Sequence, residues 1–130
     1  SRVDLPAGQY QFLVRARNAS RLLINGKLIA STGFLSRNAS GHETVPPAVP
    51  SQRKDLVDLS PGHNQALVDM TLGKPPPGGH VILLETFVGG AGVRTELGEL
   101  MVGYAAKGKP FQLLGGDTSH PRGLSAVLPL

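Results

Sequence analysis

The first thirty residues follow the apolar–polar pattern of β-strands. Along 9–17, apolar side chains occupy every second position, at Tyr10, Phe12, Val14 and Ala16. This period of two is typical of a strand with one buried face. Asn25-Gly26 stands between two apolar runs and predicts a tight two-residue hairpin. The opening therefore predicts three strands joined by two tight turns.

Similar patterns continue along the rest of the chain. Further strands are expected at 53–59, 65–72, 80–88, 93–102 and 111–114, and the chain ends in an apolar run at 124–130. In the second of these, Ala66, Val68, Met70 and Leu72 are expected to face the core. The third is the most apolar, so we expect it to lie centrally in the fold. About eight strands with regularly spaced turns predict an all-β, antiparallel, jelly-roll-like β-sandwich.

Length and composition support a single β-rich domain. We assign 1–123 to the sandwich and 124–130 to an apolar segment that can add a strand to a sheet edge. The 17 Gly and 11 Pro residues favour turns over long helices, and the absence of Cys excludes disulfides and thiolate metal sites. No signal peptide or apolar run of membrane-spanning length is present, and a chain that begins at Ser1 without Met suggests a processed or excised piece.

The opening motifs resemble a known family. Leu-Pro-Ala-Gly-x-Tyr-x-Phe at 5–12 and Arg-Leu-x-Ile-Asn-Gly-Lys-Leu-Ile at 21–29 resemble the protective-antigen-type β-sandwich domain of bacterial toxins, glycosidases and yeast adhesins. The segment 14–22 is similar to related domains in large secreted planctomycete proteins. The resemblance covers 5–29 and, more weakly, 79–87. It implies a secreted, periplasmic or cell-surface location.

The resemblance also implies a sugar site that this chain does not reproduce. Sugar-binding members of the family carry two adjacent aspartates after the first strand, and these hold a calcium ion that in turn holds the sugar. Here Arg17 and Asn18 stand at those positions. Arginine is always cationic and has no acceptor atom, so it cannot ligate calcium. We therefore expect no metal and no cofactor.

The candidate ligand contacts are cationic, amide and aromatic side chains near turns. They are Arg15, Arg17, Asn18, Arg21, Phe34 and Tyr104. The arginines form the densest cationic group of a chain with net charge +4 and could hold an acidic polymer, or they could protect a strand edge from unwanted pairing. Phe34 and Tyr104 lie near predicted loops, where an aromatic ring can pack against a sugar. Tyr10, Phe12 and Phe87 are expected in the core.

The remaining ionisable residues show no catalytic pattern. The histidines all lie in or beside predicted turns, at His42, His63, His80 and His120, and are expected on the surface. Glu85 lies within the most apolar strand, where we expect an arginine such as Arg94 to pair with it. No nucleophile elbow or phosphate loop occurs in the chain, which therefore is not expected to be an enzyme.

Two functions remain open at this point. The first is a non-catalytic extracellular module that binds a glycan or a cell-surface polymer. The second is a structural protomer of an extracellular self-assembling fibre or multi-subunit surface complex, which would use 124–130 to contact its own copies or neighbouring domains. The scattered positive charge lacks the dense basic block of a nucleic-acid-binding protein, so no nucleic-acid partner is expected.

Overall fold

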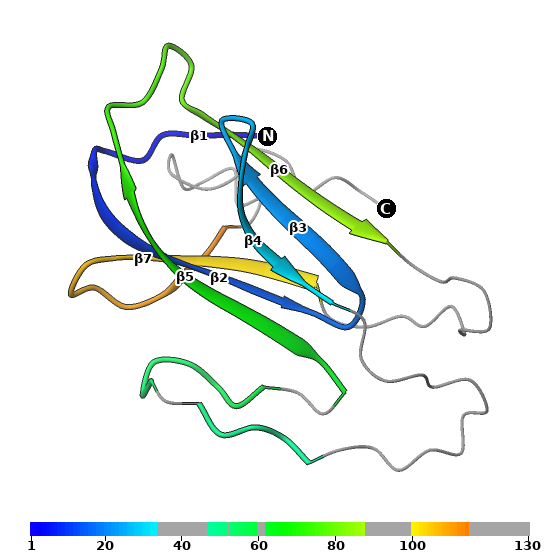
Figure 1. The fold of residues 1–130 in the computed structure, drawn as a ribbon. Helices are drawn as coiled ribbons and strands as arrows, with labels where there is room; N and C mark the ends of the chain where they lie inside the picture. The colour runs from blue at the N-terminus through cyan, green and yellow to red at the C-terminus, as the bar shows by residue number, and fades with distance from the viewer. Residues whose placement is uncertain (34–46, 52, 60–61, 88–99, 115–130) are drawn as a thin grey trace.

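The computed structural model describes residues 1–33, 47–51, 53–59, 62–87 and 100–114, which form two antiparallel sheets of four strands (Figure 1). Sheet I has the order β1-β6-β3-β4, with β1 at Arg2–Val3, β6 at His80–Phe87, β3 at Ala19–Ile24 and β4 at Lys27–Thr32. Sheet II has the order β5-β2-β7-β8, with β5 at Asn64–Leu72, β2 at Gly8–Ala16, β7 at Leu100–Ala106 and β8 at Gln112–Leu113. The predicted all-β sandwich is confirmed. No helix that could cross a membrane occurs in the part of the chain described.

The predicted hairpin joins β3 to β4. Asn25 and Gly26 have φ angles of 51° and 79°, the left-handed values that a tight hairpin turn requires. The turn is also bonded to β6. The Asn25 backbone N–H donates to the Val81 carbonyl at 2.8 Å, and the side-chain Oδ1 of Asn25 accepts from the Val81 backbone N–H at 2.9 Å. A local sequence signal and a long-range contact thus specify the same turn.

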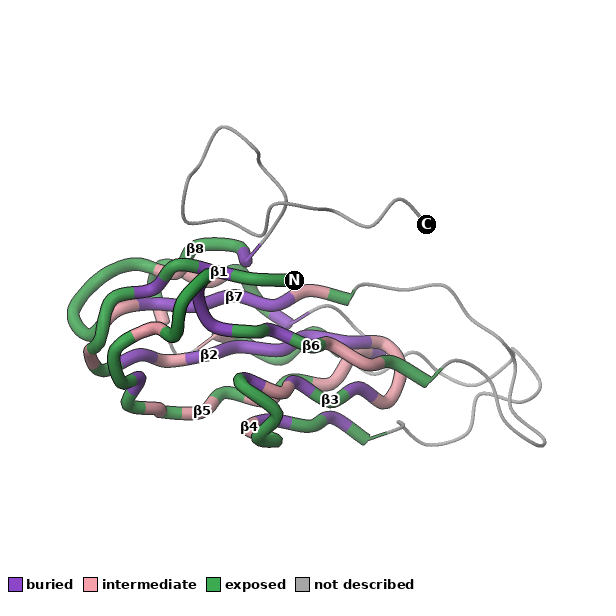
Figure 2. Tube along the Cα trace, turned by 90° about the horizontal axis from the view of Figure 1, so that it is seen from above, coloured by how far each residue is buried: buried purple, intermediate pink, exposed green. Residues whose placement is uncertain are grey.

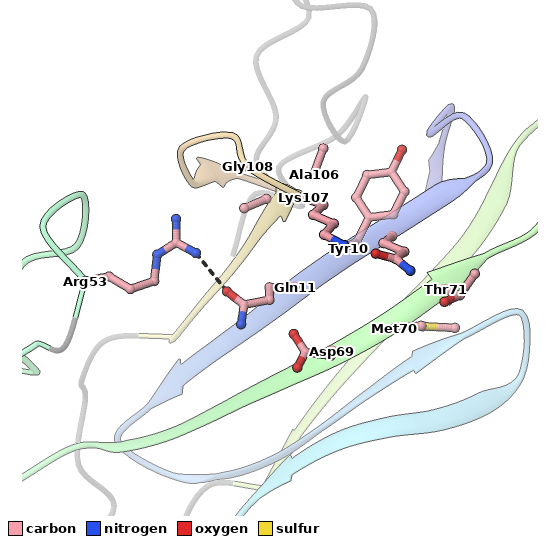
Figure 3. Close-up of a pocket in the computed structure, with 11 residues that line it drawn as sticks. Tyr10, Gln11, Arg53, Asp69, Met70, Thr71, Ala106, Lys107 and Gly108 are labelled. Carbon is pink, nitrogen blue, oxygen red and sulfur yellow. Dashed lines mark hydrogen bonds between the residues drawn. The ribbon is translucent and has the colours of Figure 1, made fainter.

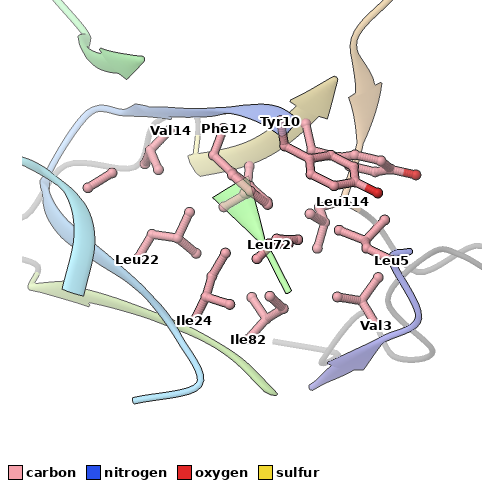
Figure 4. Close-up of a cluster of buried hydrophobic side chains, with 13 residues drawn as sticks. Val3, Leu5, Tyr10, Phe12, Val14, Leu22, Ile24, Leu72, Ile82 and Leu114 are labelled. Atoms are coloured by element: carbon pink, nitrogen blue, oxygen red, sulfur yellow. The ribbon is translucent and has the colours of Figure 1, made fainter. Parts of the chain in front are cut away.

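A single apolar core fills the space between the sheets (Figure 4). Its members come from both sheets and from the segments that border them, and they include Val3, Leu5, Tyr10, Phe12, Val14, Leu22, Ile24, Leu72, Ile82, Val102, Tyr104 and Leu114. The inward positions predicted for β5 are confirmed, because Ala66, Val68 and Met70 pack against this cluster. Each large side chain buried here stabilises the sandwich by roughly 1.5–3 kcal/mol.

The outer face of sheet II is partly covered by residues 53–59, here called the covering segment. This segment was predicted as a strand, and that prediction is wrong: within 47–59 the described backbone forms a turn and one isolated bridge, between Val49 and Leu59. The covering segment contacts the outward side chain of Arg15, which is buried together with that of Leu13. As a result β2 is buried along most of its length (Figure 2).

Other predicted elements need adjustment. The strand expected at 93–102 extends instead to Ala106, while 93–99 lie outside the described residues, as do 124–130. The strand at 80–88 is confirmed as far as Phe87, but it is not buried on both faces, since Val81 and Leu83 are exposed. His80 begins this strand and is buried, so its predicted surface position is wrong. Its Nδ1 lies 2.9 Å from the Asn25 Nδ2.

Candidate ligand-binding site

A hollow of about 540 Å³ opens on sheet II beside Arg53, where the covering segment begins (Figure 3). We call it the β2 hollow. The residues whose side chains face outward there are Gln9 and Gln11 of β2, Asp69 and Thr71 of β5, Ala105 of β7, and Lys107 just after β7. The hollow therefore has a polar floor, in contrast to the apolar core on the other side of the same strands.

The strand register brings this polar floor together. Gln11 lies opposite Asp69 on one side and Ala105 on the other, and Gln9 lies opposite Thr71. Directly opposed residues of an antiparallel pair have Cβ atoms about 5 Å apart, so these side chains form two adjacent polar rows. The Ala105 side chain is a single methyl group, so the hollow is deeper beside Gln11.

Arg53 forms one wall of the hollow and is held in place on several sides. Its Nη1 donates to the Gln11 Oε1 at 2.8 Å (Figure 3). Its Nε and Nη2 each donate to a carboxylate oxygen of Asp55 at 2.8 Å. The guanidinium also lies over the Phe111 ring, 4.6 Å from its centroid. Because the planar group is fixed by these contacts, it also fixes the orientation of the Gln11 amide.

Asp55 completes this arrangement. Besides the two bonds from Arg53, its Oδ2 accepts the Phe111 backbone N–H at 2.9 Å. The Arg53 hydrogen bonds, followed by the Phe111 amide, hold the pKa of the Asp55 carboxyl well below its usual range. The hydrogen bonds that Arg53 donates to Asp55 also raise the pKa of Arg53. Both groups stay charged near neutral pH, so at that pH the Arg53–Asp55 pair that forms this wall of the hollow stays intact.

The chemistry of the hollow suits a ligand rich in hydroxyl groups. Amide, hydroxyl, carboxylate and ammonium groups offer both donors and acceptors along a short stretch of surface. Asp69 is the one carboxylate among the described residues that line it. In the described part of the chain no group of three or more His, Asp or Glu residues is placed to hold a metal ion.

A second, shallower hollow of about 530 Å³ lies on sheet I around Arg21, Glu85 and Phe87. The Arg21 Nε donates to the Glu85 Oε2 at 2.9 Å, and both side chains are substantially exposed. Glu85 thus pairs with Arg21 of the neighbouring strand rather than with Arg94, which lies outside the described residues. Phe87 is 59% exposed, so its predicted place in the core is wrong.

The three arginines that are close in sequence do not share a surface. Arg15 is buried on sheet II, where it donates to the Gln65 Oε1 at 2.9 Å and to the Val57 carbonyl at 2.7 Å. Arg17 donates to the Gly62 carbonyl at 2.7 Å. Of the three, only Arg21 belongs to sheet I, and its side chain is exposed.

The other predicted contacts are also dispersed. The Asn18 carbonyl accepts a bond from the Thr32 hydroxyl at 3.2 Å, which ties the β2–β3 turn to β4. Tyr104 is buried within β7, not near a loop, and its hydroxyl donates to the Gln112 Oε1 at 2.8 Å. Phe34 lies outside the described residues. Arg15 and Tyr104 are therefore both buried, at 2% and 7% exposed.

The residues of the β2 hollow were missed by the sequence analysis. A signal for them existed: Gln9, Gln11, Asp69 and Thr71 are the outward positions of two strands whose inward positions were predicted correctly. Their meeting depends on the pairing of β2 with β5, which the sequence does not specify.

Comparisons of the chain with protein-family models, with curated proteins and with solved structures gave no match. The function of this β-sandwich is therefore inferred chiefly from the geometry of its own residues.

Proposed function

We propose that this domain is a non-catalytic binding module of a secreted, periplasmic or cell-surface protein, and that its β2 hollow holds a segment of a glycan or similar hydroxyl-rich polymer. The observation that carries the proposal is the double row of outward polar side chains, Gln9–Thr71 and Gln11–Asp69, beside the fixed guanidinium of Arg53.

The donor and acceptor pattern favours hydroxyl groups as the ligand. A hydroxyl both donates and accepts, so neighbouring hydroxyls can bond at once to an amide such as Gln11 and to a carboxylate such as Asp69. Because Arg53 already orients Gln11, part of the entropy cost of ordering the site is met before the ligand arrives. Lys107 extends the site to acidic sugars through charge-assisted bonds.

The same residues favour binding without turnover. Hydrolysis of a glycosidic bond generally needs two carboxyl groups on facing walls, one of them acting as the acid. The described lining of the hollow supplies Asp69 only, and the nearby Asp55 is occupied by Arg53 and by the Phe111 amide. The resemblance to protective-antigen-type domains supports the same class of function, with a polar strand surface in place of calcium.

The test is a glycan array followed by calorimetric titration of the best polysaccharide. Gln11→Ala and Asp69→Asn should each weaken binding about tenfold, the loss expected when one buried hydrogen bond is removed. Asp4→Asn is the matched control, because Asp4 is exposed and does not line the hollow. Binding that is equal in all three variants, or no binder across neutral and acidic glycans, would overturn the proposal.

A further inference from the structure

Three of the described residues that line the β2 hollow carry a charge: Arg53, Asp69 and Lys107. The charge of Arg53 is balanced by Asp55, to which the guanidinium donates two hydrogen bonds. Among the described residues, neither the Asp69 carboxylate nor the Lys107 ammonium has an ion-pair or hydrogen-bond partner. The hollow therefore offers one unpaired negative charge and one unpaired positive charge to a ligand.

The strand ladders fix where these two charges lie. Asp69 belongs to β5 and lies opposite Gln11 of β2. Lys107 follows β7, and its backbone N–H donates to the Gln9 carbonyl at 2.9 Å, which places it opposite Gln9 (Figure 3). Since neighbouring strands lie about 5 Å apart and each residue advances a strand by about 3.4 Å, the two Cα atoms are roughly 12 Å apart. The opposite charges thus occupy diagonal corners of the polar floor.

The floor between the two corners is uncharged. Gln9 and Gln11 lie between them on β2, and Thr71 lies beside Gln9 on β5. Amide and hydroxyl groups both donate and accept hydrogen bonds, so they can bond to sugar hydroxyls whatever the charge of the polymer. The two corners therefore add a charge requirement to a floor that by itself accepts any glycan.

We propose that the β2 hollow binds a zwitterionic glycan, whose repeat carries both a free amine and a carboxylate. This inference rests on the proposed function and names its class of ligand. The ligand's amine pairs with Asp69 and its carboxylate pairs with Lys107, in each case through charge-assisted hydrogen bonds. Because the corners lie two strands apart, the two charges belong to neighbouring sugars of the repeat.

The two corners also select against other polymers. A polyanion would place a carboxylate beside Asp69, and a polycation would place an amine beside Lys107, so each meets a repulsive corner. A neutral glycan avoids both repulsions but gains neither charge-assisted bond. A peptide is disfavoured because the hollow lies on the face of sheet II and presents side chains, whereas an added peptide strand pairs with backbone groups at a sheet edge.

Four forms of one oligosaccharide test the inference by calorimetric titration. The parent is a hyaluronan oligosaccharide, an anion in which glucuronate alternates with N-acetylglucosamine. N-deacetylation frees the amines and gives the zwitterion, methyl esterification of the parent gives the neutral form, and both treatments together give the cation. We expect the zwitterion to bind at least about tenfold more tightly than each of the other three forms, the gain expected from one charge-assisted bond.

Two substitutions assign each ligand charge to its residue. In Lys107→Gln the zwitterion should lose its advantage over the cation, because the ligand carboxylate no longer has a partner. In Asp69→Asn it should lose its advantage over the anion, because the ligand amine no longer has one. Lys27→Gln and Asp4→Asn are the matched controls, since both residues are exposed and lie outside the hollow, and they should keep the full preference.

The possible failures are distinguishable. Equal binding of all four forms would overturn the inference and leave the proposed function standing, because the hollow would then recognise hydroxyl groups alone. An advantage of the zwitterion that survives both substitutions, or equally tight binding of an alternating lysine–aspartate peptide, would also overturn it. Absence of binding by all four forms would overturn it too, and the glycan array decides separately whether the proposed function fails as well.

Discussion

Arg15 and Arg21 lie only six positions apart in the sequence, and the structure predicts that they differ sharply in their contribution to stability. Replacing Arg15 with alanine should lower the free energy of unfolding by about 3 kcal/mol, whereas the same change at Arg21 should cost less than about 1 kcal/mol. The difference arises from burial: Arg15 is 2% exposed, while the Arg21 side chain is 60% exposed.

The magnitude for Arg15 follows from its partners. Its guanidinium makes two close hydrogen bonds, to the Gln65 Oε1 and to the Val57 carbonyl, and a longer one of 3.4 Å to the Asp58 carbonyl. A hydrogen bond to a charged group contributes roughly 1.5–3 kcal/mol, and part of the total is offset because folding removes the guanidinium from water. Alanine would remove both close bonds together with the packing of the buried Arg15 side chain, which gives a net loss of about 3 kcal/mol.

Urea unfolding followed by tyrosine fluorescence measures both variants. The chain has no Trp, and both of its tyrosines, Tyr10 and Tyr104, are buried, so their emission reports on the core. The reasoning is refuted if Arg15→Ala unfolds within about 1 kcal/mol of the wild type, or if Arg21→Ala is the more damaging change.

Two further predictions concern a carboxylate and a turn. Because the folded pKa of Asp55 is depressed, its contribution to stability is present above its ordinary value of 3.8 and is lost as the pH falls below it toward the folded pKa. Asp55→Asn should therefore destabilise the protein at pH 7 and flatten the loss of stability below pH 4, as measured by urea unfolding at a series of pH values; an unchanged pH profile would contradict this. Gly79→Ala should cost about 2 kcal/mol or more, since φ at Gly79 is +90° and the added Cβ would lie 2.7 Å from the Val3 carbonyl oxygen. Gly73→Ala is its control, because a Cβ there meets nothing within 4 Å, and equal melting temperatures for the two variants would refute the prediction.

The strands that the sequence predicted well carry strong local signals. The Asn25-Gly26 pair specifies a hairpin without help from distant residues, and the period of two along 9–17 and 65–72 correctly separates inward from outward positions. Residues 53–59 have apolar and polar positions that resemble a strand, but the described sheets provide no ladder for them. A pattern alone cannot show whether a segment has a neighbouring strand.

β6 illustrates a second limit. Four apolar residues in a row, 81–84, conceal which of them face the core, so the sequence supplies no register for this strand. Pairing with β3 decides which residues of β6 face the core. Leu22 and Ile24 of β3 point inward, so their partners Leu84 and Ile82 point inward too. The alternate residues Leu83 and Phe87 therefore point outward.

The sequence by itself therefore determined the class of fold, the β3–β4 turn, and the two faces of β2 and β5, because each depends on residues only a few positions apart. Tertiary structure alone decided which arginine is buried, which aromatic ring is exposed, and where the β2 hollow lies. That hollow joins residues near positions 10, 53, 70 and 106. Whether a side chain is buried or exposed there depends on which distant segment packs beside it, and no local pattern encodes that choice.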